Sequence, residues 1–244
     1  MKLTTDALII RENNAVGESD RFVTALTRSN GIVQASVRGA RNIKNRNGSA
    51  TQLLCYSRLS LYKGREKYIV DDAEPLQVFF EVRGQLDKLA LAQYFCELAG
   101  VLAPREEEAE TELRLLLNGL HYLSEGTRPL WLIKAVVELR LLCRAGYMPA
   151  VEYCAGCGCV DVDGFSPSKG VLLCSRCSQG GDVLPLTPNG LAAFRHIVYA
   201  PFEKCFAFSL PEAEGQAFGN VVERFLLTQL NRSFQTLEFY HSLV

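Results

Sequence analysis

The chain of 244 residues lacks the features that mark a membrane or exported protein. It has no apolar run of about 18 residues, which excludes a membrane-spanning helix. The apolar stretch near its N-terminus is broken at Arg11 and Glu12, and no small-residue cleavage site follows it. It therefore does not predict a signal peptide. We expect a cytoplasmic protein with no part in a membrane.

The sequence also lacks the short motifs of common enzyme classes. It contains no Walker A sequence, no dinucleotide-binding glycine pattern, no nucleophile-elbow serine and no zinc-protease helix. Its three histidines, His121, His196 and His241, are isolated, and we expect them to be surface or helix residues rather than ligands. We expect that the chain is not an enzyme. Because it lacks a Walker A sequence, we also expect that its activity is not powered by its own hydrolysis of ATP.

Charge is nearly balanced overall but unevenly distributed. The net charge is −1, yet residues 1–83 hold 13 Lys/Arg against 9 Asp/Glu, and residues 84–244 hold 13 against 18. Residues 28–67 contain nine basic residues and a single acidic one, Glu66. A patch of one sign attracts a polyanion whatever the average charge of the chain.

The periodicity of apolar residues changes near residue 84. Before it, turn residues separate five strand-like runs: Ala7 to Ile10, Phe22 to Leu26, Ile32 to Val37, Leu53 to Tyr62 and Lys67 to Val70. Residues 39–49 are polar and basic, which predicts an exposed loop. Later apolar residues follow a helical period, with helices expected over 91–102, 113–120 and 130–143 and after Thr187 and Pro211. We predict a small five-stranded barrel over 1–80 and an α-helical domain over 81–244.

Nine cysteines are present, and four of them form two C-x-x-C pairs: Cys154, Cys157, Cys174 and Cys177. Thiols in the cytosol stay reduced, so paired cysteines indicate a metal rather than disulfides. A separation of sixteen residues between the pairs lies in the range that predicts a zinc site. Four thiolates close the shell of one tetrahedral Zn²⁺, so we predict a structural site within an insertion at about 150–181. Gly156 and Gly158 are expected to permit the backbone angles of the first turn.

Other interpretations of the cysteines stay open. Cys159 can replace Cys154 as a ligand, and Cys157, Cys159, Cys174 and Cys177 together are also typical of redox-regulated zinc chaperones. A zinc-ribbon interaction module is a further alternative. The only basic residues in the segment 150–180 of the chain are Lys169 and Arg176, and this argues against a ribbon that binds nucleic acid. A zinc deaminase is excluded, because no Pro precedes either C-x-x-C and no His or Cys stands two residues before a nearby Glu.

The basic residues of the barrel form two groups. One surrounds the polar loop (Arg38, Arg41, Lys44 and Arg46), and the other flanks the last hairpin (Arg58, Lys63, Arg65 and Lys67). On one face of a barrel they would follow a phosphate backbone, with Tyr56, Tyr62 or Tyr68 available to stack on bases. Binding of this kind is weakly selective for sequence and sensitive to salt.

Several stretches, taken in order, resemble the RecO family of bacterial DNA repair and recombination mediators. The first is Gly17-Glu18-Ser19-Asp20-Arg21, and the second runs from Leu26-Thr27 through Gly31 to Arg38-Gly39-Ala40-Arg41. The third stretch combines Glu138, Leu141-Leu142, Gly146 and Pro149 with the following Cys154, Cys157 and Gly158. The fourth, Leu230 to Leu237, is a looser match. Together they span nearly the whole chain.

The resemblance implies an α+β protein with an N-terminal OB-fold barrel and a helical domain that carries the zinc module. It implies a protein that binds and anneals single-stranded DNA in the bacterial nucleoid. The expected partners are RecR, single-strand-binding protein and, indirectly, RecA. By motif, Arg21, Arg38 and Arg41 become the better DNA-contact residues, although Arg21 could instead brace the barrel by pairing with Asp20 or Glu18.

Overall fold

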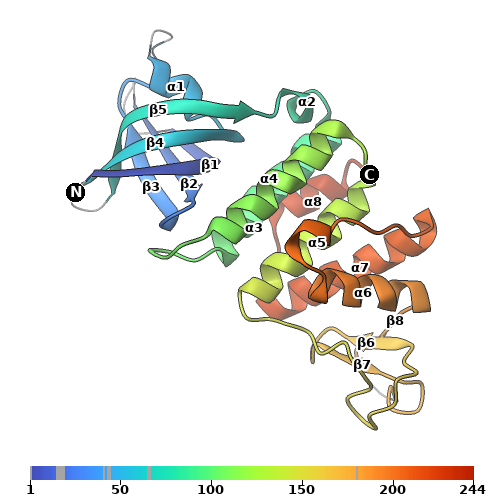
Figure 1. Cartoon of the computed structure of the whole chain (residues 1–244). Helices are drawn as coiled ribbons and strands as arrows, with labels where there is room; N and C mark the ends of the chain where they lie inside the picture. Colours follow the sequence, from blue (N-terminus) through green and yellow to red (C-terminus); the bar gives the residue numbers. More distant parts are fainter. Residues whose placement is uncertain (1, 15–19, 41, 43–44, 65–66, 180) are drawn as a thin grey trace. The chain divides into compact units, whose positions relative to one another are not determined.

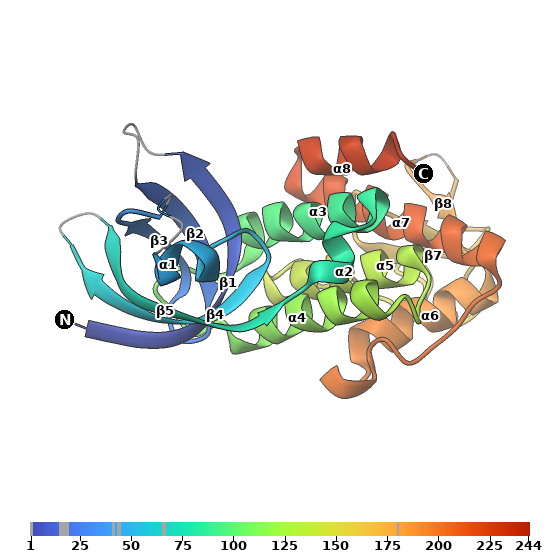
Figure 2. The same ribbon diagram turned by 90° about the horizontal axis from the view of Figure 1, so that it is seen from above.

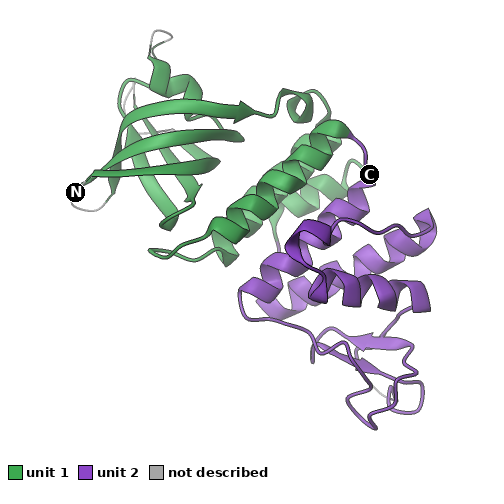
Figure 3. Cartoon of the chain, viewed as in Figure 1, with its two compact units in different colours: residues 1–125, 234–244 green, residues 126–233 purple. Residues whose placement is uncertain are grey.

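The computed structural model of the chain describes residues 2–14, 20–40, 42, 45–64, 67–179 and 181–244. The chain forms two compact units, unit 1 (residues 1–125 and 234–244) and unit 2 (residues 126–233), coloured separately in Figure 3. The helices that follow residue 80 are thus shared between both units, and the sequence boundary near residue 80 stays a prediction. Over the described ranges, no helix is long and apolar enough to cross a membrane.

Unit 1 contains a closed five-stranded barrel (Figure 1). Its strands follow the order β1-β2-β3-β5-β4 around the barrel. They are β1 (Lys2–Asn14), β2 (Arg21–Thr27), β3 (Gly31–Val37), β4 (Cys55–Lys63) and β5 (Tyr68–Val78). Only the β3–β5 pair is parallel; the other neighbours are antiparallel. The barrel is OB-like, which confirms the predicted fold class.

Two strands and one helix differ from the sequence expectation. β1 and β5 extend well beyond their short apolar runs, because β1 pairs with β4 near its start and with β2 near its end. A bulge between Ile9 and Arg11 separates the two halves of the β1–β2 ladder. The end of the predicted loop is α1 (Arg46–Ala50), which begins after Asn45 because the Asn45 side chain accepts from the Asn47 N–H at 3.0 Å.

Small and β-branched side chains fill the barrel. Alternate residues of each strand point inward, and the buried set includes Ala7, Ile9, Val23, Ala25, Val33, Ala35, Val37, Leu59, Leu61, Val70 and Ala73. On β4, Cys55, Leu59 and Leu61 are buried, whereas Arg58 and Tyr62 are exposed. A five-stranded barrel leaves little internal volume, which explains the six alanines of its buried cluster, counting Ala40 and Ala50 outside the strands.

Besides α1, unit 1 contains the helices α2 (Phe80–Arg83), α3 (Leu86–Leu102), α4 (Glu110–Glu125) and α8 (Gln235–His241). α3 and α4 contact β1 and β2, where the outward side chains of Leu8, Ile10 and Leu26 are buried. α8 lies beside α3 in Figures 1 and 2, with Phe234 edge-on to Tyr94 at 5.7 Å. The C-terminal segment therefore completes the N-terminal unit.

Backbone hydrogen bonds fix the β2–β3 hairpin to the loop between α3 and α4. Ile32 donates to the Pro104 carbonyl at 2.9 Å, and Ala109 donates to the Arg28 carbonyl at 2.9 Å. Gly31 lies between these bonds with φ +59°, and a Cβ there would come within 2.0 Å of the Pro104 oxygen. Both the backbone angle and the close approach require glycine.

Unit 2 is built on three helices, α5 (Leu130–Arg144), α6 (Pro188–Tyr199) and α7 (Glu212–Leu230). α5 contacts both of the others, and almost all of its side chains are buried, as its apolar sequence predicted. Gly215 of α7 leaves room for Trp131, since a Cβ would lie 2.3 Å from the indole. Thr187 caps α6 by accepting from the Gly190 N–H at 3.0 Å, as expected.

A buried lysine joins two helices of unit 2. Lys134 of α5 lies 2.8 Å from a Glu138 oxygen and 2.7 Å from a Glu223 oxygen of α7. Burial opposes its charge, but the two carboxylates outweigh burial and raise the pKa of Lys134. Lys134 therefore stays protonated and links α5 to α7.

We expect Gly31→Ala to destabilise unit 1 by about 3 kcal/mol or more, because it combines an unfavourable φ with a clash against backbone. Gly39→Ala is the matched control. Gly39 also has φ +59°, but the nearest atom of the described residues to its Cβ would be the Asn45 side-chain nitrogen at 3.3 Å, so we expect a loss of about 1 kcal/mol. Urea unfolding followed by circular dichroism measures both. Equal losses would show that the Pro104 contact is not constraining.

Candidate metal centre and nucleic-acid interface

Two tight turns carry the four cysteines of the C-x-x-C pairs, and a hairpin of unit 2 joins the turns. β6 (Gly164–Ser166) pairs antiparallel with β7 (Val171–Leu173), and β8 (Leu184–Pro185) pairs with β6 on its other side. The Ala155 N–H donates to the Leu172 carbonyl at 2.9 Å and ties the first turn to β7. The β6–β7 hairpin returns the chain to the second turn.

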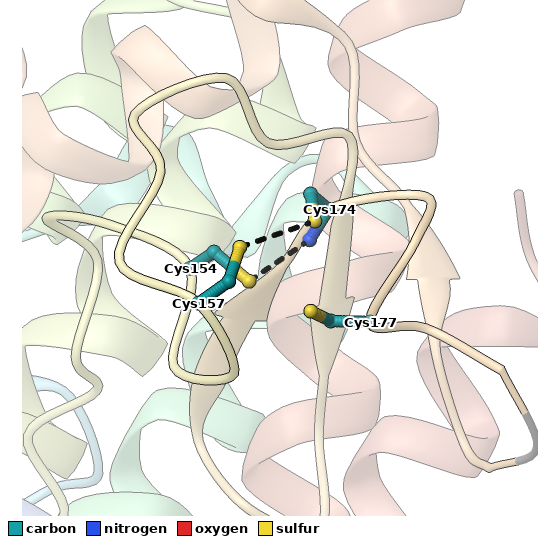
Figure 4. A group of neighbouring side chains, drawn as sticks. All are labelled: Cys154, Cys157, Cys174 and Cys177. Atoms are coloured by element: carbon teal, nitrogen blue, oxygen red, sulfur yellow. Dashed lines mark hydrogen bonds between the residues drawn. The ribbon is translucent and has the colours of Figure 1, made fainter.

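The four cysteine sulfurs converge on one point, as Figure 4 shows. All of them lie within 4.8 Å of one another, and Cys157 and Cys174 are 3.7 Å apart. A tetrahedral zinc with bonds of about 2.3 Å requires sulfurs about 3.8 Å apart. The four residues therefore fit a metal ion of this size, and the predicted ligand set of Cys154, Cys157, Cys174 and Cys177 is the set that the fold brings together.

Backbone N–H groups favour the thiolate form of Cys154, one of the two buried cysteines of this centre. The Cys174 N–H points at the Cys154 sulfur at 3.4 Å. Burial raises the pKa of the Cys154 thiol, but N–H groups of Cys174, Gly156 and Cys157 outweigh it and hold that pKa at about 6. The thiolate is the form that binds metal, so the turns are preorganised for a cation.

The two glycines of the first turn have different roles. Gly158 has φ +74°, so it supplies the backbone angle that the sequence predicted. Gly156 is needed for space instead, because a Cβ there would lie 2.8 Å from the Cys177 sulfur. The requirement at Gly156 depends on the second turn, which sequence alone does not place.

Cys159 lies next to the centre but outside the converging group. Its thiol donates to the Asp161 carbonyl at 3.2 Å, and its backbone carbonyl accepts from the Cys154 N–H at 2.8 Å. The sequence had left open an exchange of Cys159 for Cys154. In the described part of the chain, Cys154 and Cys174 are the buried members of the group, and Cys159 is not part of it.

The cysteine module is anchored to the helices of unit 2. Phe165 of β6 packs against Phe194 of α6 at 4.8 Å and against Phe225 of α7 at 5.2 Å, measured between ring centroids. Arg195 of α6 donates to the carbonyls of Val151 and Glu152, both at 2.7 Å. The cysteine module is therefore joined to α6 and α7 through its hairpin and its first turn.

The predicted basic residues of the barrel are not equivalent. Arg41, Lys44 and Arg65 lie outside the described residues. Arg38 follows β3 and is exposed, Arg46 begins α1 and is exposed, and Lys63 ends β4 and is exposed. Arg21 lies 3.4 Å from Glu12 and also donates to the Gly48 carbonyl at 3.3 Å, so its bracing partner is Glu12 rather than Asp20.

One outer face of the barrel, over β1, β4 and β5, is rich in carboxylates. Arg58 lies 3.0 Å from Asp6 and opposite Glu74, and its neighbour Ser60 lies opposite Asp72. Lys2 at the same face lies 3.1 Å from Asp71. A hydrogen bond and charge from Asp6 raise the pKa of Arg58. Carboxylates neutralise the cations of this face, so the face does not favour binding of a polyanion.

The opposite outer face has a different composition. Its central side chains point away from the core on β2, β3 and β5, and we call them the β2–β3 face: Phe22, Thr24, Gln34, Ser36 and Ile69. Arg11 and Asn13 of β1, together with Arg38 and Lys67, stand at its edges. Among the described strand residues that point outward here, none is a carboxylate; the Asp20 carboxylate, which precedes β2, accepts from the Gly39 N–H at 2.8 Å beside Arg38. This face can therefore attract a phosphate chain.

The sequence pattern did not single out Arg11 and Phe22 as outward-facing residues of this surface. It also gave Tyr68 as available for stacking on bases. Tyr68 packs against the barrel core, while Tyr56 and Tyr62 lie on the carboxylate-rich face. Phe22 and Arg11 face outward because of the strand register and the bulge in β1. The alternation of residues 21–27 carried a signal for Phe22, since Val23 and Ala25 are the inward neighbours.

Comparisons with known proteins agree with this architecture. The model of Recombination protein O N terminal matches residues 1–79, and that of Recombination protein O C terminal matches residues 83–238. The chain is 32% identical to DNA repair protein RecO of Acetivibrio thermocellus, over 99% of this chain and 97% of the relative. It is 30% identical to DNA repair protein RecO of Symbiobacterium thermophilum, over 98% and 96%. The chain belongs to the RecO family of DNA repair proteins.

Proposed function

We propose that this protein binds single-stranded DNA along the β2–β3 face of its barrel and anneals complementary strands. As a family member it would work with RecR on strands coated by single-strand-binding protein, so that RecA can load, in the cytoplasm at the bacterial nucleoid. We propose that it acts by binding rather than by catalysis. The observation that carries the location is the contrast between the two outer faces of the barrel.

The charges and side chains of the β2–β3 face support this location. OB-like barrels commonly bind oligonucleotides over strands 2 and 3 and the loops beside them. Here that surface has Arg11, Arg38 and Lys67 at its edges and neutral polar side chains at its centre. Cations contact phosphates, and neutral polar groups contact sugars and bases without a fixed sequence. Weak sequence selectivity suits a protein that must bind any damaged strand.

We also propose that Cys154, Cys157, Cys174 and Cys177 hold one Zn²⁺ with a structural role. A closed shell of four thiolates leaves no position for a reacting water, and bound zinc would supply folding energy to unit 2. The packing of Phe165 on α6 and α7 supports this role. The side chains of the β2–β3 face belong to unit 1, so the zinc ligands and the proposed DNA contacts are in different units.

We expect Arg38→Ala to weaken binding of a labelled single-stranded oligonucleotide by about three- to tenfold. The slope of log Kd against log salt should fall by about 0.7, the value for one lost phosphate contact on a single strand. Arg58→Ala is the control and should leave the slope unchanged, because Asp6 already neutralises Arg58. Fluorescence anisotropy at several salt concentrations measures both. A larger effect from Arg58→Ala would move the DNA to the other face, and no binding by the wild-type protein would refute the proposal.

We expect Cys174→Ser to lose zinc and to destabilise unit 2 by about 3 kcal/mol or more, since the metal contributes to folding. Cys159→Ser should retain one zinc per chain and near wild-type stability. Elemental analysis gives the zinc content and calorimetry the unfolding temperature. DNA affinity measured below the unfolding transition should be nearly unchanged in both variants. A folded Cys174→Ser protein with equal loss of zinc and DNA binding would contradict a purely structural centre.

A further inference from the structure

Phe22 is an aromatic side chain placed on the outside of the barrel. Its neighbours along β2, Val23 on one side and Arg21 on the other, do not share its direction, and its cross-strand partners Asn13 and Ser36 are polar. The ring is half-buried and does not belong to the barrel core. Packing of the core therefore does not account for an aromatic residue here.

The ammonium of Lys67 lies over the Phe22 ring. The Lys67 nitrogen is 4.5 Å from the ring centroid, within the range of a cation–π contact. Lys67 immediately precedes β5. The parallel β3–β5 pairing places Ile69 of β5 opposite Ser36 and so brings this end of β5 beside β3. Within the described ranges Lys67 makes no ion pair, so its charge is available to a phosphate. The exposed Lys67 side chain thus places its ammonium over one face of the half-buried Phe22 ring.

An unpaired nucleobase fits this arrangement better than a base pair does. A flexible strand can place the flat face of one base on an aromatic ring while its phosphates contact nearby cations. In a duplex each base is already stacked between its neighbours, and only its edges are accessible in the grooves. An outward phenylalanine surrounded by neutral polar side chains and cations therefore distinguishes the two forms of DNA.

We propose that Phe22 stacks on one unpaired base in the position that the Lys67 ammonium now occupies, and that this contact gives the protein its preference for single strands over duplexes. The inference rests on the proposed function and assigns it a specificity-determining residue. On binding, Lys67 leaves the ring and moves to an adjacent phosphate. An exposed cation–π contact is weaker than a base–aromatic stack, so the exchange favours the bound state.

The test compares three probes: oligothymidylate of about 15 nucleotides, a wholly abasic oligonucleotide of the same length, and a duplex of the same length. Anisotropy with wild-type protein, Phe22→Leu, Phe22→Tyr and Lys67→Ala gives each Kd and its salt slope. Phe22→Leu should weaken binding to oligothymidylate about 5- to 100-fold. Its affinity for the abasic strand and the duplex, and its salt slope, should be unchanged. Phe22→Tyr should keep the wild-type preference.

Lys67→Ala should instead weaken binding to all three probes and reduce the salt slope by about one phosphate contact. The inference would be overturned if Phe22→Leu bound oligothymidylate as tightly as the wild type does. It would also be overturned if Phe22→Leu lost affinity equally for all three probes. If Phe22→Leu does not fold, the wild-type protein decides: less than about a fivefold preference for oligothymidylate over the abasic strand refutes stacking. No binding of any probe by wild-type protein would refute the proposed function itself.

Discussion

The surface of the barrel depends on one pairing, the parallel contact between β3 and β5. Ala35 lies opposite Tyr68 and Ser36 opposite Ile69, and these two pairs close the sheet. Closure turns the inner side chains into a core and divides the outer ones into faces of opposite character. It also brings Lys67, which is distant in sequence, over Phe22. Both the polyanion-attracting face and the proposed stacking site follow from this contact.

The hairpin between β2 and β3 connects this barrel to the helices of unit 1. Glycine at position 31 lets the backbone approach Pro104 closely, and hydrogen bonds on both sides hold the α3–α4 loop. The helices bury Leu8, Ile10 and Leu26, which would otherwise be apolar outer side chains of β1 and β2. The helices therefore cover the apolar part of the outer surface. The β2–β3 face has polar side chains instead, and it is the part that suits a strand of nucleic acid.

Much of the fold could be predicted from local patterns, because strand and helix periods are local properties. The strands around Phe22 to Leu26 and Ile32 to Val37, the buried helix over 130–143 and the cap at Thr187 agree with the structure. The full lengths of β1 and β5 could not be predicted, since their polar ends are strands only through pairing with β2 and β4. The sequence around Arg46 predicts a loop rather than a helix, because the capping residue Asn45 is also common in turns.

The sequence by itself determined which four cysteines cluster, and it indicated the family. Cysteine spacing is a covalent property, and a C-x-x-C turn delivers two thiolates to one ion wherever it occurs in a fold. Only the tertiary structure decided which cations face a possible DNA strand. Arg58 and Arg38 are alike in sequence, but Asp6 pairs with one, and the other lies at the edge of a face without carboxylates on its strands. The electrostatic potential of a surface depends on distances between residues far apart in the chain, and strand register and barrel closure set those distances.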